Sequence, residues 1–137
     1  MKAIAALVLL VCLLPSAVLA DCRVNVNAHV ALLGTTDDPD VFVWDSRFRL
    51  RDYEGGTFDR MQALLPHAVL ARPGTRATVE SCVPNFVQPK YQEKPEDAVG
   101  IVITSGPLRG QRGWVLGSAV RPMLLSSGRL RVRRRLR

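Results

Sequence analysis

The stretch SGPLRGQRGWV, residues 105–115, joins two apolar runs, VGIVIT before it and the WVLGSAV that starts within it. Proline offers no N–H to a sheet and so ends the first run. Glycine adopts the positive φ that other residues resist, and we expect both Gly110 and Gly113 to do so. The stretch therefore predicts two strands joined by a tight turn. The residues of this hairpin motif are Gly106, Pro107, Gly110, Gly113 and Trp114.

The first twenty residues, MKAIAALVLLVCLLPSAVLA, have the pattern of a secretory signal peptide. Lys2 provides the basic start, and small residues precede the expected cleavage after Ala20. The apolar run is shorter than the roughly 18–20 residues that span a bilayer. Asp21 stands directly before Cys22, where a lipoprotein signal needs a small uncharged residue. We therefore expect an exported protein, periplasmic or extracellular, with one domain over residues 21–122 and a basic tail over 123–137.

Cleavage leaves two cysteines, Cys22 and Cys82. In an oxidising compartment this even pair predicts a disulfide, which the chain-entropy model values at roughly 4 kcal/mol. Two free thiols are the alternative. A tetrahedral zinc site needs four ligands and would use both cysteines together with His29 and His67, so we expect no metal and no other cofactor.

Positive charge is concentrated at the C-terminal end. The chain has 19 Lys+Arg and 12 Asp+Glu. Residues 121–137 contain seven of the arginines and no acid, and Lys2 lies in the signal, so residues 21–120 hold 11 basic and 12 acidic residues, a net charge of −1. The high pI therefore belongs to the tail.

Three interpretations of the tail stay open. It can contact an anionic surface such as lipid headgroups or a wall polymer, it can be a basic terminus without a partner, or it can add a last strand, because RLRVR alternates. The export signal argues against nucleic acid as a partner. The arginines that would meet an anionic surface are Arg129, Arg131, Arg133, Arg134, Arg135 and Arg137.

The remaining chain divides into short elements, most of them strands. One short helix is predicted over 57–68, because its apolar residues recur at helical spacing before a proline. Residues 72–75, Arg-Pro-Gly-Thr, fit a type II turn. Strands are predicted over 22–34, 41–44, 45–51, 68–71, 76–81, 98–106 and near Val120, and a long loop over 82–98.

The predicted strand 45–51 suggests a binding surface. Its arginines alternate with Phe48 and Leu50, which puts three guanidinium groups on one face with an aromatic residue near each end. Guanidinium groups suit carboxylates. The alternative is an edge strand that its charges protect from aggregation. The residues of this predicted surface are Trp44, Arg47, Arg49 and Tyr53, joined by Tyr91 from the long loop.

Together, PGTRATVES at 73–81 and AVGIVITSGPLRGQRGWVLGSAV at 98–120 resemble the bacterial SH3-like domains of exported proteins. The shared features are a Gly-Thr turn that opens a strand, and a G-x-x-G-W-V step followed by a short 3₁₀ turn and a closing strand. The usual Val-Arg-x-Gly-Pro start is absent. The resemblance implies a mainly-β fold: a small, partly open five-stranded barrel, here with an added N-terminal strand and one short helix. It also implies that the hairpin motif shapes the barrel.

Domains of this kind are associated with cell-wall peptides or protein segments, so the resemblance implies a non-catalytic binding module of the bacterial envelope. Its partner would be peptidoglycan, a wall peptide or an envelope protein. The alternative is a structural protein that docks an acidic envelope partner or an anionic surface through its tail. No nucleophile, phosphate-loop or dinucleotide motif is recognisable, so we do not expect an enzyme.

Overall fold

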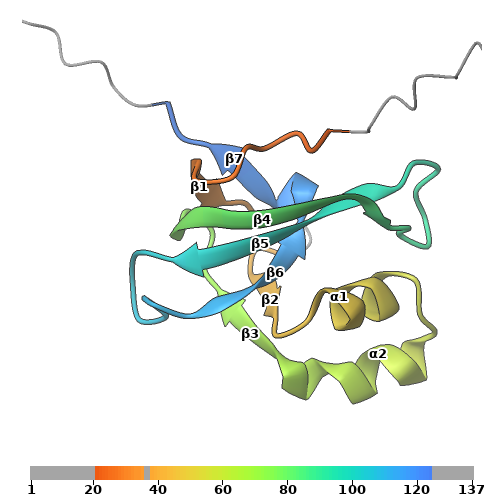
Figure 1. Cartoon of the computed structure of the whole chain (residues 1–137). Coiled ribbons are helices and arrows are strands. Elements are labelled where there is room, and N and C mark those ends of the chain that lie inside the picture. The colour runs from red at the N-terminus through yellow and green to blue at the C-terminus, as the bar shows by residue number, and fades with distance from the viewer. Residues whose placement is uncertain (1–20, 36–37, 125–137) are drawn as a thin grey trace, which may run out of the picture.

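The computed structural model describes residues 21–35 and 38–124. In this part of the chain seven strands form one curled, open antiparallel sheet in the order β3-β2-β6-β5-β4-β1-β7 (Figure 1). The prediction of a mainly-β fold is confirmed, but the prediction of five strands and one addition is wrong. The strands are β1 (His29–Leu32), β2 (Val41–Trp44), β3 (Ala68–Ala71), β4 (Arg76–Val87), β5 (Glu96–Ile103), β6 (Arg112–Leu116) and β7 (Val120–Pro122).

Two helices lie side by side near β2 and β3, away from β1 and β7 (Figure 1). They are α1 (Arg47–Glu54) and α2 (Phe58–Leu64), and α1 contacts β2, β4, β5 and β6. Two 3₁₀ turns, η1 (Leu65–His67) and η2 (Gly117–Ala119), complete the elements. The predicted short helix, the 3₁₀ turn before the last strand and the last strand itself are thus confirmed.

The sheet has a separate apolar cluster on each face, because successive side chains of a strand point to opposite faces. On β2, Val41 and Val43 join the main core, whereas Phe42 and Trp44 join the cluster beneath α1. β5 contributes to both clusters. This explains why its sequence is an unbroken apolar run rather than an alternating one.

The predicted hairpin is confirmed: β5 and β6 pair antiparallel, with Val99 opposite Val115. Gly106 and Gly110 have φ of 73° and 88°, and the Gly110 N–H donates to the Ile103 carbonyl at 2.7 Å. The prediction of a positive φ at Gly113 is wrong. Gly113 lies inside β6. Because it has no side chain, β2 can approach β6 closely at this point.

The strand predicted over 45–51 is wrong, because Arg47–Glu54 form the helix α1. Ser46 caps the helix by accepting a hydrogen bond from the Phe48 N–H at 3.2 Å. Leu50 is fully buried and Tyr53, three residues later, packs in the same cluster. The alternation of Arg with Phe and Leu is compatible with a strand as well as with a helix. The segment is helical because α1 packs against β2 and β6.

The strands flanking residues 72–75 are confirmed, and Gly74 has the φ of 82° that a type II turn requires. They do not pair with each other, since β3 pairs with β2 whereas β4 pairs with β1 and β5. The long loop predicted over 82–98 is shorter, because β4 continues to Val87. Register shifts and the positive φ of Asn85 let this part of β4 include a proline.

The N-terminal strand is shorter than predicted. β1 covers only His29–Leu32, and it pairs with β4 on one side and β7 on the other. His29 is exposed, as the alternation predicts. Before β1, buried Val24 reaches the main core.

Candidate functional site

Aromatic side chains from β2 and α1 line an open groove of about 530 Å³. The ring centroids of Trp44 and Tyr53 are 4.7 Å apart, and Phe42 lies 5.6 Å from Tyr53 and 5.9 Å from Trp44. Phe42 and Trp44 share a face because they are two residues apart on one strand. Tyr53 reaches them from the last turn of α1. We call this feature the aromatic groove.

Two short segments border the aromatic groove. One consists of the described residues between β1 and β2, 33–35 and 38–40, and the other is the η2 turn with Ser118 and Ala119. The Leu33 N–H donates to the Ala119 carbonyl at 2.8 Å, which holds the two segments together at one end.

The border of the groove is acidic. Its four described carboxylates come from three places in the sequence: Asp38 and Asp40 before β2, Glu54 at the end of α1, and Glu96 at the start of β5. Glu96 accepts a hydrogen bond from the Ser118 hydroxyl at 2.9 Å. In the described chain none of these four carboxylates forms an ion pair. Aromatic faces next to negative charge suit a cationic ligand group.

Burial, together with a smaller repulsion from the nearby Glu96 carboxylate, raises the pKa of the Glu54 carboxyl to about 7. Burial also raises the pKa of the Tyr53 phenol, with added repulsion from Glu54 and Asp38. Both shifts have the same origin: partly buried acids share the groove with other acids.

Glu54→Gln is expected to stabilise the protein at pH 8. A glutamate titrates near 4.5 when unperturbed and here at about 7. Between these values the folded state holds a proton that the unfolded state has lost, so the free energy of unfolding falls as pH rises. The neutral amide removes this loss, and we expect a gain of roughly 1–2 kcal/mol after allowance for solvent screening.

Urea unfolding of wild type and Glu54→Gln at pH 4 and pH 8 measures this effect. The gain should be present at pH 8 and nearly absent at pH 4. An equal difference at both values would contradict the raised pKa.

Of the predicted binding surface the structure brings together only Trp44 and Tyr53, in the aromatic groove, and it places Arg47, Arg49 and Tyr91 elsewhere. Trp44 is only 1% exposed and is part of the core beneath Tyr53. Arg49 forms an ion pair with Asp45 on the exposed side of α1. Tyr91 is 92% exposed, and it lines a separate hollow with Phe58 and Met61 rather than joining the others.

Arg47 belongs to a different cluster, which the sequence prediction missed. Its guanidinium carbon lies 5.1 Å from the Phe48 ring centroid, 5.3 Å from that of Phe86 and 5.8 Å from that of Trp114. Arg51 packs on Phe48 and Phe86 in the same way. Phe86 lies in what the sequence suggested to be loop, so no local pattern identified it. Trp114 is half-buried and covers Gly100 on the neighbouring strand.

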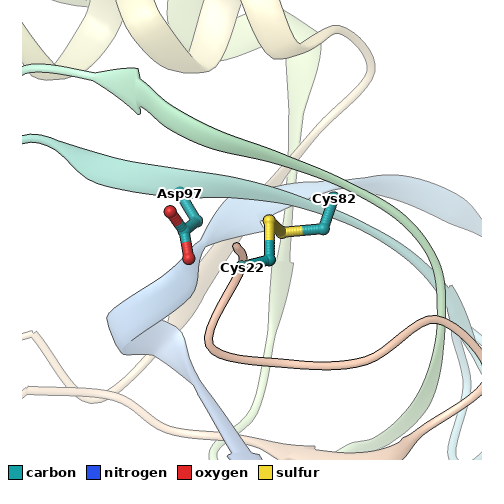
Figure 2. A group of neighbouring side chains, drawn as sticks. All are labelled: Cys22, Cys82 and Asp97. Carbon is teal, nitrogen blue, oxygen red and sulfur yellow. A yellow bond between two sulfur atoms is a disulfide. The ribbon is translucent and has the colours of Figure 1, made fainter. Parts of the chain in front are cut away.

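The predicted disulfide is confirmed, since Cys22 and Cys82 are bonded (Figure 2). Buried Asp97 lies beside it and accepts N–H groups from Arg23 and Asn85, both at 3.1 Å. The three side chains are close enough to resemble a metal cluster, but two of the ligand atoms are joined as a disulfide. A disulfide indicates an oxidising, non-cytoplasmic environment.

The six tail arginines from Arg129 to Arg137 lie outside the described residues, so all three interpretations of the tail remain predictions. No helix in residues 21–35 and 38–124 is long and apolar enough to cross a membrane. Comparison with known protein families, curated proteins and solved structures returned no match.

The aromatic groove is the main feature that sequence reasoning missed. Trp44 and Tyr53 were both identified, but as ends of a cationic strand. The alternation in VFVW at 41–44 indicated that Phe42 and Trp44 share a face. Nothing local indicated that Glu54 and Glu96 would border the same groove, because 41 residues separate them and only the fold brings them together.

Proposed function

We propose that this protein is a non-catalytic, exported binding module of the bacterial cell envelope that holds an extended peptide in the aromatic groove. The peptide is a wall peptide or a protein segment that presents an amino or guanidinium group. The resemblance to bacterial SH3-like domains remains part of this proposal.

The observation that carries the proposal is the composition of the groove: aromatic rings in its floor, and at its border carboxylates that form no ion pair with any residue of 21–35 and 38–124. Concave aromatic surfaces with a few placed polar groups are typical ligand sites. A ligand amino group would exchange some of its bound water for contacts with the carboxylates. The carbon chain that carries this amino group would pack on the aromatic rings.

The other chemical groups of the described chain support binding rather than catalysis. Both described cysteines are in the disulfide. His67 lies 3.3 Å from the Asp45 carboxylate, and His29 lies 3.4 Å from the Thr78 hydroxyl. Neither histidine lines the groove.

The double substitution Asp38→Asn, Asp40→Asn tests the groove directly. Both side chains border the groove and pair with no cation of the described residues, so the change removes charge and breaks no ion pair of the described fold. Co-sedimentation with purified peptidoglycan and titration with amine-bearing wall peptides should show binding weakened about two- to thirtyfold, given about 0.2–1 kcal/mol for each of the two exposed charges.

Asp59→Asn, Glu93→Gln is the matched control. It removes the same charge from exposed positions outside the groove. Equal losses in the two doubles would mean that overall charge alone governs binding, and no binding by wild type would reject wall peptides as the ligand.

A further inference from the structure

The negative charge of the aromatic groove is not balanced within the described chain. The acidic residues that form ion pairs in the described chain are Asp45, Asp52 and Glu80, and none of them lines the groove. Its own carboxylates are Asp38, Asp40, Glu54 and Glu96. Like charges around one hollow repel each other and favour a cationic occupant.

The groove also suits a particular kind of cation. A guanidinium group is planar, is always charged and stacks on aromatic faces while its N–H groups bind carboxylates. The rings of Phe42 and Tyr53 provide the faces, and the carboxylates at the border lie beside them.

The same chain contains a segment of matching chemistry. Residues 129–137, RLRVRRRLR, contain six arginines and no acid. In an extended conformation its first five residues would present arginines on one side and Leu130 and Val132 on the other. Arginines would then face the carboxylates and the apolar side chains would cover the rings.

The chain is long enough for this contact. β7 begins beside the groove, where Val120 is opposite Leu32, and the described chain ends at Leu124. The four steps from Val120 to Leu124 span at most about 14 Å. The five steps from Leu124 to Arg129 reach up to about 17 Å, so the arginines can return to the groove from which β7 leads away.

We propose that the arginine-rich segment 129–137 of the same chain docks in the aromatic groove as an intramolecular occupant. This rests on the proposed function, because it treats the groove as a peptide site. An incoming peptide must displace the segment. The segment therefore sets the affinity that a peptide needs in order to occupy the groove.

The test compares three forms of the full oxidised protein: wild type, a form with all six arginines of 129–137 changed to glutamine, and a form with the same six changed to lysine. All substitutions lie outside the described residues. The primary readout is the pKa of the Glu54 side-chain carboxyl, followed by ¹³C NMR, with the amide shifts of Phe42 and Tyr53 beside it.

A docked guanidinium favours the charged carboxylate. Glu54 should therefore titrate about one unit or more lower in wild type than in the glutamine form, and the lysine form should stay close to wild type. The difference in Glu54 pKa should shrink at about 1 M salt, where the Debye length is about 3 Å.

The difference in Glu54 pKa between wild type and the glutamine form should not depend on protein concentration. A concentration-dependent difference would assign the groove to the tail of a second copy and overturn intramolecular docking, as would equal titration in wild type and the glutamine form.

Wall-peptide titration of the same forms separates this inference from the proposed function. If both are right, the glutamine form binds the amine-bearing peptide several-fold more tightly than wild type, because the competitor is gone. If Glu54 titrates identically but Asp38→Asn, Asp40→Asn still weakens peptide binding, only the docking is wrong. If Glu54 shifts but no wall peptide binds, only the proposed ligand is wrong.

Discussion

A chain with Cys22→Ser and Cys82→Ser is expected to lose about 4 kcal/mol of its free energy of unfolding. The disulfide closes a loop of 60 residues, and the chain-entropy model gives this value for a loop of that length. For a domain of this size the loss corresponds to a decrease in Tm of roughly 15–25 °C. Thermal and urea unfolding of both forms measure it.

The structure shows why loss of the disulfide should destabilise the core as well as the N-terminal segment. The bond ties the segment before β1 to the centre of the long strand β4. That segment carries Val24 into the main core, and the Asn27 N–H donates to the Val79 carbonyl at 2.7 Å. Without the bond, these contacts alone must hold the segment in place.

The form with both cysteines changed to alanine is the control, because it separates the loss of the bond from the cost of a partly buried hydroxyl. Both double variants should lose similar stability. A loss below about 1 kcal/mol in either would mean that the unfolded chain is already compact or that the bond strains the fold.

The second large effect is expected for Gly113. A Cβ at this position would overlap Cγ1 of Val43 and lie 2.8 Å from the carbonyl oxygen of Trp44. Gly113 is buried in β6, which pairs with β2 through Trp44 and Trp114. The overlap involves backbone, so relief requires the two strands to separate. We expect Gly113→Ala to cost about 2–3 kcal/mol, and Gly113→Val to cost more.

Gly110→Ala is the matched control within the same hairpin. Gly110 has a φ of 88° but open space around it, so its variant should lose only about 1–2 kcal/mol from backbone strain. Sequence reasoning treated these two glycines alike, and the structure separates them. If urea unfolding gave Gly113→Ala the smaller loss, the close approach of β2 and β6 would be wrong.

The prediction from sequence was successful where the physical cause is local. Gly106 and Gly110 are turn glycines because the chain reverses within a few residues, and α2 ends before a proline for the same kind of reason. The disulfide followed from counting two cysteines after a predicted export signal. None of these inferences requires knowledge of what lies across the sheet.

The errors arose where a local pattern permits two structures. RFRLR alternates like a strand, but Leu50 and Tyr53 also share a helix face, and the cluster beneath α1 gives both a place to pack. Likewise, CVPNFV was predicted to be loop because of its proline, whereas the irregular register of β4 accommodates that residue in a strand. Propensity is weak compared with burial in such cases.

The sequence by itself determined a mainly-β chain with one glycine-rich hairpin, one short helix within 57–68, a cysteine pair able to bond and an arginine-rich end. Only the tertiary structure decided that Trp44 is core, that Gly113 serves close approach, and that carboxylates from three separate segments border one aromatic groove. The reason is physical. A residue's backbone preference acts over a few neighbours, whereas burial and charge depend on which distant strands the sheet brings together.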